Sequence, residues 1–301
     1  MENEFRLGLV CIFRKEPIKF RRTTAKYLKK LTKNERLKKL SDICWKNAIS
    51  LQKALEFCSN NAIGDFRVNS QILPLKTHPE VGYDIQTLCN GADIVAKFEE
   101  CGDYAKRQGL RVTFHPDQFV VLSSNNPKVR NNSIKEIDYQ AEVSEWINAD
   151  VINIHGGGRY DSKSKALKRL SHSFERLSSA AKERLTIEND DYIYSPLDLI
   201  PVCKKLRIPF VYDVHHHRCL TDKMSIEEAT VAAIDTWNRE PLFHISSPKN
   251  GWNHLNCRPH HDYINIEDFP SCWKDKKLTI EVEAKSKELA VLKLKKDLKN
   301  K

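Results

Sequence analysis

Short runs of β-branched and aromatic residues recur along the chain, and segments with helical periodicity separate them. Six of these runs carry a histidine, an aspartate or a glutamate at or near their C-terminal end. The eight strand-like runs are RLGLVCIF (6–13), FRVNS (66–70), RVTFH (111–115), VINIH (151–155), LTIEND (185–190), FVYDV (210–214), LFHIS (242–246) and LTIEVEA (278–284). This alternation predicts eight βα units that close into a (β/α)8 TIM barrel, with the active site at the C-terminal ends of the strands.

Helical segments are expected between these strands, and two of them carry clear start signals. Ser195 followed by Pro196 is typical of a helix N-terminus, and Ser225 with Glu228 has the spacing of a capping box. The expected helices are 35–58, 88–108, 134–148, 163–182, one that starts at Ser195, 225–237, and one from about 285. An open, doubly wound sheet is the competing architecture, but such a sheet collects its site at one switch point. The barrel is favoured because ligand-type residues end most of the strands.

The composition narrows the classes of function. The chain has 301 residues, of which 40% are hydrophobic, as is ordinary for a globular protein and too high for disorder. No linker or internal repeat interrupts the pattern, so we expect a single domain over residues 1–301. Fifty Lys and Arg against 40 Asp and Glu give a net charge of +10. A positive charge of this size favours nucleic acid or another polyanion as the partner.

Cysteine usage and hydropathy indicate the compartment. The nine cysteines form no C-x-x-C pair, and we expect them to be reduced thiols of an intracellular protein. The N-terminal sequence MENEFRLGLVCIF lacks the features of a signal peptide, and no apolar stretch approaches the ~20 residues of a membrane helix. We therefore expect a soluble protein without a membrane partner, cytoplasmic in a prokaryote and nuclear in a eukaryote.

Metal-ligating residue types collect where the expected strands end. Imidazole and carboxylate groups bind Zn²⁺, Mn²⁺ and Fe²⁺. A lone histidine is more often a hydrogen-bonded structural residue, but buried carboxylates that converge need cations to offset their charge. The candidate ligands are His115, His155, Glu188, Asp213, His216, His244, His260 and Glu283. Within the triplet His215-His216-His217 the spacing alone does not choose the ligand, and at least one member is expected to be structural or exposed.

Three further segments are candidates for contact with a polyanion. Residues 14–34 hold nine Lys or Arg against one acid and follow the first strand, so they would lie beside the metal site and could grip phosphates. The alternative for this segment is a solvated helical face. In HPDQF (115–119), Phe119 beside an amide could wedge into a base stack or could plug the core under its loop. Gly156-Gly157-Gly158-Arg159 could cradle phosphate, but a tight barrel turn explains it equally well.

Taken in order along the chain, these motifs resemble the UV damage endonuclease family, distant relatives of endonuclease IV. The resemblance spans nearly the whole chain. It rests on FRVNS with LPLKTHPEV, FHPDQF, NIHGGG, TIENDD, FVYDVHHH, FHISSP, HHDYI and VEAKSKELA. The family consists of metal-dependent TIM-barrel repair enzymes. These enzymes nick DNA immediately 5′ to cyclobutane pyrimidine dimers and 6-4 photoproducts, and usually also cut at abasic sites.

The resemblance implies which residues hold the metal ions. It implies that His216 is the ligand within the histidine triplet and that His78 is a further ligand beside the eight candidates. It also implies two or three divalent ions, with Mn²⁺ preferred and Zn²⁺ or Co²⁺ as alternatives. The catalytic residues expected on this basis are Glu188, His115 and His155. We expect Glu188 to bridge two ions.

The resemblance also implies how DNA is bound. Gln118 and Phe119 match the pair that fills the gap left when damaged bases leave the stack. We expect the basic segment and the glycine-rich turn to contribute phosphate contacts through Arg21, Arg22 and Arg159. The expected partner is damaged double-stranded DNA, bound by a monomer.

The chain departs from the family pattern at three positions. Leu9 follows the first-strand glycine where relatives often have Tyr, Phe13 lies where Asn is frequent, and Leu242 replaces a common Lys. These departures put the rate and the lesion preference in question. Two other functions stay open: a sugar-isomerase-like barrel enzyme with a similar metal site, and a DNA-damage binding protein without catalytic activity.

Overall fold

Eight parallel strands close into a barrel in the computed structural model, which describes residues 5–300. β1 pairs with β2 on one side and with β8 on the other, and this pairing closes the sheet. The strands are β1 (Arg6–Val10), β2 (Asp65–Val68), β3 (Arg111–Phe114), β4 (Val151–His155), β5 (Leu185–Glu188), β6 (Phe210–Asp213), β7 (Leu242–Ile245) and β8 (Thr279–Val282). The predicted TIM barrel is confirmed and the open sheet is excluded. Residues 1–4 of the segment considered as a signal peptide lie outside the described part.

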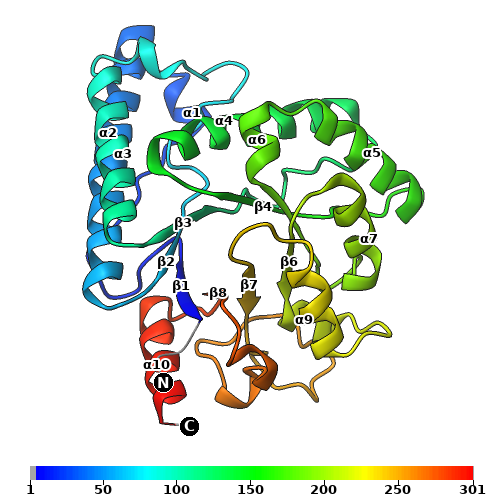
Figure 1. The fold of residues 1–301 in the computed structure, drawn as a ribbon. Helices are drawn as coiled ribbons and strands as arrows, with labels where there is room; N and C mark the ends of the chain where they lie inside the picture. The colour runs from blue at the N-terminus through cyan, green and yellow to red at the C-terminus, as the bar shows by residue number, and fades with distance from the viewer. Residues whose placement is uncertain (1–4, 301) are drawn as a thin grey trace.

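Helices surround the barrel and cover the outer faces of its strands (Figure 1). They are α1 (Ala25–Leu28), α2 (Lys33–Asn60), α3 (Gly91–Arg107), α4 (Pro127–Ile147), α5 (Lys163–Glu175), α6 (Ser179–Arg184), α7 (Pro196–Leu206), α8 (Val214–Cys219), α9 (Ile226–Ile234) and α10 (Glu288–Lys299). Three short 3-10 helices are η1 (Ile85–Thr87), η2 (Ile266–Asp268) and η3 (Ser271–Trp273). None of the helices described over residues 5–300 has the length and apolarity needed to span a bilayer.

Two helix boundaries differ from the expectation because polar side chains cap new helix starts. The helix expected from 134 begins at Pro127, since the Asn126 side chain caps its first turn. The helix expected over 163–182 is divided into α5 and α6, since Ser178 caps a second helix. Both capping residue types satisfy backbone N–H groups that the first turn leaves unpaired.

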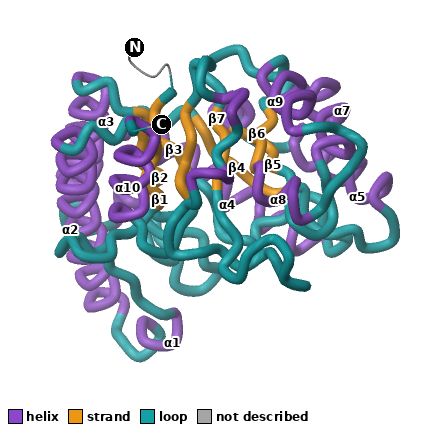
Figure 2. Tube along the Cα trace, turned by 90° about the horizontal axis from the view of Figure 1, so that it is seen from below, coloured by secondary structure: helices purple, strands orange, loops and turns teal. Residues whose placement is uncertain are grey.

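The strand register brings the polar strand ends together. His155 on β4 lies opposite Glu188 on β5, and Asp213 on β6 lies opposite His244 on β7. Side chains alternate between the two faces of a strand, so partners in register point to the same face. Loops and α1 gather at one end of the strands in Figure 2. That end holds the carboxyl ends of the strands, where barrel active sites form.

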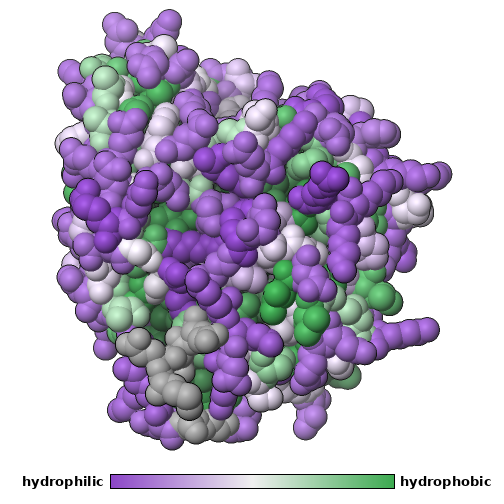
Figure 3. Space-filling view, viewed as in Figure 1, coloured by the Kyte–Doolittle hydropathy of each residue, from purple (hydrophilic) through white to green (hydrophobic). Residues whose placement is uncertain are grey.

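Apolar packing accounts for two of the departures from the family pattern. Leu242 lies fully buried in a small cluster with Val151 and Val211, two residues before His244 on its own strand. Phe13 packs edge-on against Phe57 and stacks on Phe66, with ring centroids 5.2 and 6.1 Å apart. Both residues therefore contribute to apolar packing in the barrel. The face in Figure 3 is largely hydrophilic, with apolar atoms in separate patches.

Candidate metal centre

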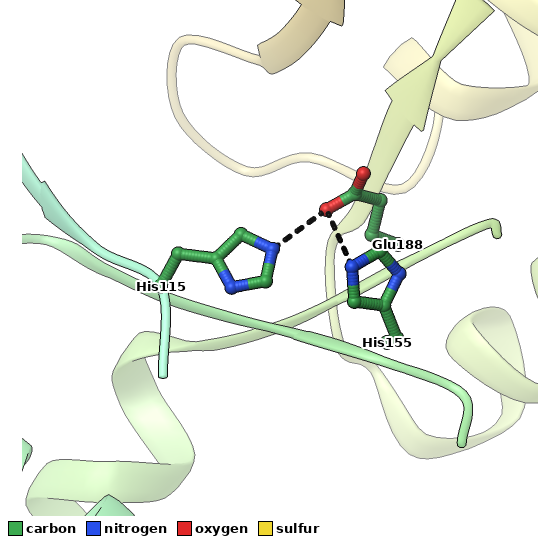
Figure 4. A group of neighbouring side chains, drawn as sticks. All are labelled: His115, His155 and Glu188. Atoms are coloured by element: carbon green, nitrogen blue, oxygen red, sulfur yellow. Dashed lines mark hydrogen bonds and ion pairs between the residues drawn. The ribbon is translucent and has the colours of Figure 1, made fainter. Parts of the chain in front are cut away.

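Glu188 lies at the carboxyl end of β5, and its buried carboxylate faces histidines from two neighbouring strands (Figure 4). Its Oε2 atom is 3.1 Å from His115 Nε2 and 4.0 Å from His155 Nε2. Asn153, two residues before His155, donates its side-chain N–H to the same oxygen at 2.5 Å. One oxygen of Glu188 thus meets three polar side chains, two from β4 and one from the residue just after β3.

The second carboxylate oxygen of Glu188 faces the other side of the barrel. Oε1 is 3.2 Å from His216 Nδ1 and 3.1 Å from His244 Nδ1. Asp213 Oδ2 lies 3.4 Å from the same His216 nitrogen. Glu188 therefore stands between two sets of ligand-type side chains.

Glu283 extends the cluster toward β8. Its Oε1 atom is 3.5 Å from His244 Nδ1, and its Oε2 atom is 3.7 Å from His260 Nδ1. Three sets of ligand atoms lie within 4.8 Å of one another among the described residues: His115, His155 and Glu188; Glu188, Asp213 and His216; and Asp213, His244 and Glu283. Shared members join these sets into one cluster.

Several buried polar atoms of this cluster fit a bound cation. Glu188 Oε1, Asp213 Oδ2, His155 Nδ1 and His244 Nδ1 are buried and form no hydrogen bond among the described residues, because the short distances given above lack hydrogen-bond geometry. Leaving such an atom unsatisfied costs about 1–3 kcal/mol, more for a charged group. Mixed imidazole and carboxylate donors suit Zn²⁺, Mn²⁺, Fe²⁺ or Co²⁺. The side chains present therefore fit divalent metal ions.

Burial and mutual charge shift the pKa values in this cluster. Burial alone would raise the pKa of Glu188, but the positive charges of His244 and His155 hold it well below its usual range. Burial alone would lower the pKa of His244, but the Glu188 carboxylate raises it to about 10. For His216, Asp213 likewise overcomes burial and raises the pKa well above its usual value. A cation that binds here meets ionised carboxylates and displaces protons from imidazoles.

Arg67 is a buried residue of the site that sequence reasoning missed. Its Nε donates to Glu281 Oε2 at 2.6 Å, and its guanidinium also lies 2.7 Å from Glu283 Oε1. A third nitrogen lies 2.9 Å from His244 Nε2. Thr113 donates its hydroxyl to the other oxygen of Glu281 at 2.5 Å. Arg67 is thus a fixed cation that orients the β8 carboxylates.

The local fold of α8 separates the members of the histidine triplet. Asp213 caps this unexpected helix, because its Oδ1 accepts the His216 N–H at 2.8 Å. His217 contacts the Tyr212 hydroxyl at 2.7 Å. His215 Nε2 lies 3.1 Å from the carbonyl oxygen of Arg258. His216 is the member that lies against Glu188, and the other two hold the surrounding segments.

His78 stands apart from the cluster. It lies in the loop after β2, where its Nδ1 accepts the backbone N–H groups of Glu80 and Val81 at 3.1 and 3.3 Å. No contact among the described residues joins it to the other candidate ligands. It lines a mainly apolar pocket of about 400 Å³ together with Phe119.

The loop after β3 presents Gln118 and Phe119 beside the cluster. The Phe119 side chain is 63% exposed, so it does not plug the core. Gln118 lines two hollows: one of about 510 Å³ that also contains Arg22 and His115, and one of about 260 Å³ that contains His155. An exposed aromatic therefore stands next to the openings that lead to the ligand cluster.

Buried polar side chains fix the basic segment 14–34 at this end of the barrel. The carboxylate of Glu288, on α10, accepts the backbone N–H groups of Arg14 and Lys15 at 2.7 and 2.6 Å. The Asn47 side chain accepts the N–H of Arg21 at 2.6 Å. The segment is mostly irregular, with the short α1 and the first residues of α2 as its helical parts, so it does not form a continuous helical face.

The glycine-rich turn after β4 lies close to a neighbouring loop. Gly157 has φ +85°, and a Cβ atom on it would lie 2.4 Å from the Ser123 hydroxyl oxygen. Only glycine combines this backbone conformation with so close an approach. Arg159 in the same turn is exposed and makes no contact with the candidate ligands among the described residues. Packing therefore accounts for the glycine at position 157.

Comparison with known proteins agrees with this arrangement. A sequence model of the family described as UV-endonuclease UvdE matches residues 5–301. A UV DNA damage endonuclease of Bacillus cereus (strain Q1) is 36% identical over 274 residues, covering 87% of this chain and 84% of the relative. The crystal structure of SacUVDE has a TM-score of 0.87 at 28% identity and covers 98% of both chains. Endonuclease IV from Thermus thermophilus, 11% identical with a TM-score of 0.61 over 98% of this chain and 100% of that one, shares the fold. The chain belongs to the UV DNA damage endonuclease (UvdE) family.

Proposed function

We propose that this protein is a metal-dependent DNA repair endonuclease that nicks duplex DNA immediately 5′ to UV photoproducts. Cyclobutane pyrimidine dimers and 6-4 photoproducts are the main substrates, and abasic sites are a further one. The observation that carries the proposal is the position of Glu188 between the ligand sets, beside a hollow that Arg22 and His115 line. Family membership and the net charge of +10 support DNA as the substrate.

The ligand set would hold two or three divalent ions, with Mn²⁺ as the first candidate. The ligands would be His115, His155, Glu188, Asp213, His216, His244, His260 and Glu283, with His78 as a further candidate. When bound, such ions make hydroxide available near neutral pH and stabilise the oxygen that leaves. Cleavage of the bond to the 3′ oxygen gives a 3′-hydroxyl end and a 5′-phosphate end.

The remaining residues bind and orient the DNA. Arg21 and Arg22 neutralise backbone phosphates next to the cluster, and Arg159 adds a contact from the β4 loop. Phe119, with Gln118, enters the duplex where a lesion has weakened stacking and fills the gap that the displaced bases leave. Displacing damaged bases from the duplex costs less free energy than displacing paired, stacked bases. The preference for lesions therefore follows from the deformability of the DNA more than from its sequence.

One assay tests this function against its alternatives. The purified protein is incubated with UV-irradiated supercoiled plasmid in Mn²⁺, with EDTA and unirradiated plasmid as controls. Nicking that requires both irradiation and Mn²⁺ is expected. A sugar-isomerase-like enzyme would nick neither plasmid, and a damage-binding protein would retard irradiated DNA without nicking it.

Glu188→Gln sharpens the same assay. Because Gln cannot bridge cations as an anion does, this variant should lose at least about 10³-fold in nicking rate while keeping its duplex affinity. Glu240→Gln is the matched control, since Glu240 pairs with Arg6 on the first strand, away from the ligand cluster. Loss of folding in Glu188→Gln, or equal losses in both variants, would contradict a catalytic role for Glu188.

A further inference from the structure

Two thiols outside the ligand cluster, Cys219 and Cys257, lie in direct contact. Their Sγ atoms are 2.9 Å apart, although 38 positions separate them in the sequence. Two thiolates on a tetrahedral Zn²⁺, each bonded at about 2.3 Å, stand roughly 3.7 Å apart. A disulfide needs about 2.05 Å. The separation lies between these two values, and the sulfurs would have to approach by roughly 0.9 Å more to form a disulfide.

The two cysteines belong to segments that carry different candidate ligands. Cys219 is the last residue of α8, the short helix that contains His216. Cys257 lies in the segment 248–260, which returns to the barrel where Pro248 bridges to His260. This segment is mostly exposed. It also contacts α8 through the Arg258 carbonyl on His215 and through Trp252, whose ring lies 5.2 Å from that of His215.

We propose that Cys219 and Cys257 are a modification site, where a reversible disulfide fastens the segment carrying His260 to the helix carrying His216. Neither thiol takes part in the proposed nicking reaction. The contact between the two thiols does not depend on the proposed function. Only the expected effect of the disulfide on metal retention rests on the proposed function. In a reducing compartment such a bond is transient and responds to oxidants.

Thiol–disulfide exchange with oxidised glutathione forms the bond. The Cys257 thiolate attacks one glutathione sulfur, a mixed disulfide forms, and one glutathione thiolate leaves. The Cys219 thiolate then attacks the Cys257 sulfur, the Cys219–Cys257 bond forms, and the second glutathione leaves. The two protein thiols are oxidised, and two glutathione thiols carry away the electrons and protons. Both thiols are half-buried. Cys257 reacts first because burial raises the pKa of the Cys219 thiol and so disfavours its thiolate.

Peptide mapping tests the bond itself. The full chain is treated with oxidised glutathione, alkylated and digested with trypsin without reductant. Cys219 falls in the peptide 219–223, whereas Cys257 and Cys272 share the peptide 250–274 because Pro259 blocks cleavage after Arg258. Fragmentation of the linked pair should place the bond on Cys257, with a loss of two hydrogens. Alkylation of both thiols, or a bond from Cys219 to Cys272, would overturn the proposal.

Matched variants complete the mapping. Cys89→Ser removes an exposed cysteine far along the chain and should keep the linked peptides. Cys219→Ser and Cys257→Ser should each lose them. If the linked peptides persist in either variant, the assignment is wrong. The zinc content of each protein is measured as well. If the wild type binds one zinc ion per chain and either variant binds none, the two cysteines form a metal site, and the disulfide proposal is overturned.

The rate of Mn²⁺ release tests whether the disulfide fastens the segment that carries His260. Mn²⁺-loaded wild type, oxidised or reduced, is mixed with excess EDTA, and release of Mn²⁺ is followed by electron paramagnetic resonance. The oxidised form should release Mn²⁺ several-fold more slowly, and oxidised Cys257→Ser should match the reduced wild type. Equal release rates from a fully linked protein would contradict the fastening role. Failure to bind Mn²⁺ at all would instead contradict the proposed function and would leave the peptide mapping valid.

Discussion

Arg67 and Glu283 form a buried ion pair, in which the guanidinium lies 2.7 Å from the carboxylate. The same guanidinium binds Glu281 and touches His244. Arg67 thus compensates two acids at the edge of the candidate metal centre. Removing one partner of a buried pair costs about 3–5 kcal/mol, because the other charge remains without compensation.

Arg67→Gln should therefore destabilise the metal-free protein by about 3 kcal/mol and the Mn²⁺-loaded protein by less, since a divalent ion also offsets the charge of Glu283. Thermal unfolding with and without Mn²⁺ measures the difference. Arg111→Gln is the control, because Arg111 is equally buried but pairs with Asp150 before the start of β4. It should lower the Tm by similar amounts in both conditions. Equal losses with and without Mn²⁺ in Arg67→Gln would argue against a link between Arg67 and the metal centre.

Phe119→Ala should weaken binding to irradiated duplex about tenfold and leave binding to undamaged duplex nearly unchanged. The reason is that stacking of an aromatic side chain on a base contributes about 1–3 kcal/mol, and only a lesion opens the gap. Fluorescence anisotropy with both duplexes measures this ratio. Leu197→Ala, at a similarly exposed apolar residue on α7, should change neither affinity. Equal losses on the two duplexes would contradict a lesion-sensing role.

Arg21→Glu combined with Arg22→Glu should flatten the salt dependence of DNA binding. Each lost phosphate contact reduces the slope of log K against log salt by about 0.9, so the pair should reduce it by up to about 2. Affinities measured between 50 and 200 mM salt give the slope. Lys296→Glu with Lys299→Glu changes the charge equally on the exposed side of α10 and should leave the slope nearly unchanged. A double Arg variant with the wild-type slope would mean that the basic segment does not touch DNA.

The free energy of unfolding should depend on pH through Asp65. Its carboxylate is fully buried without a hydrogen-bond partner among the described residues, and burial, followed by the charge of Glu281, raises its pKa well above the usual value. Below about pH 4 the residue is protonated in both folded and unfolded chains. As pH rises the unfolded chain loses this proton first, so folding stability falls by about 1.4 kcal/mol per pH unit until the folded pKa is reached.

Asp65→Asn removes this loss, because Asn has the same shape and does not ionise. The variant should therefore gain stability relative to the wild type as pH rises from 4, and the two should converge at lower pH. Urea unfolding at several pH values gives both curves. A difference between variant and wild type that does not change with pH would show that Asp65 is ionised in the folded protein.

Strand alternation made much of the barrel predictable. His155, Asp213 and His244 end short runs of apolar residues, and the period of two places such ends on one face of a closed sheet. The same rule points to residues two positions earlier, so Asn153 and Glu281 could also have been identified as lining the site. The prediction considered only the residues at the strand ends. It therefore omitted the side chains two positions earlier, which form the next layer inside the barrel.

Other features depend on tertiary contacts that leave no pattern in the sequence. Arg67 occupies a strand position that looks like that of a surface residue, and only its three partners from β7, β8 and the residue just after β8 explain its burial. No helix was expected at α8, where three histidines follow Val214, and its start is set by the Asp213 cap. The exposure of Phe119 and the separate position of His78 depend on how long loops fold over the barrel.

Anomalous diffraction at the manganese edge, from crystals grown with Mn²⁺, tests the central claim most directly. We expect two or three peaks within coordination distance of the cluster, with Glu188 touching two of them and His115, His216 and Glu283 among the ligands. Peaks confined to other parts of the surface, in crystals of protein that nicks irradiated plasmid, would contradict it.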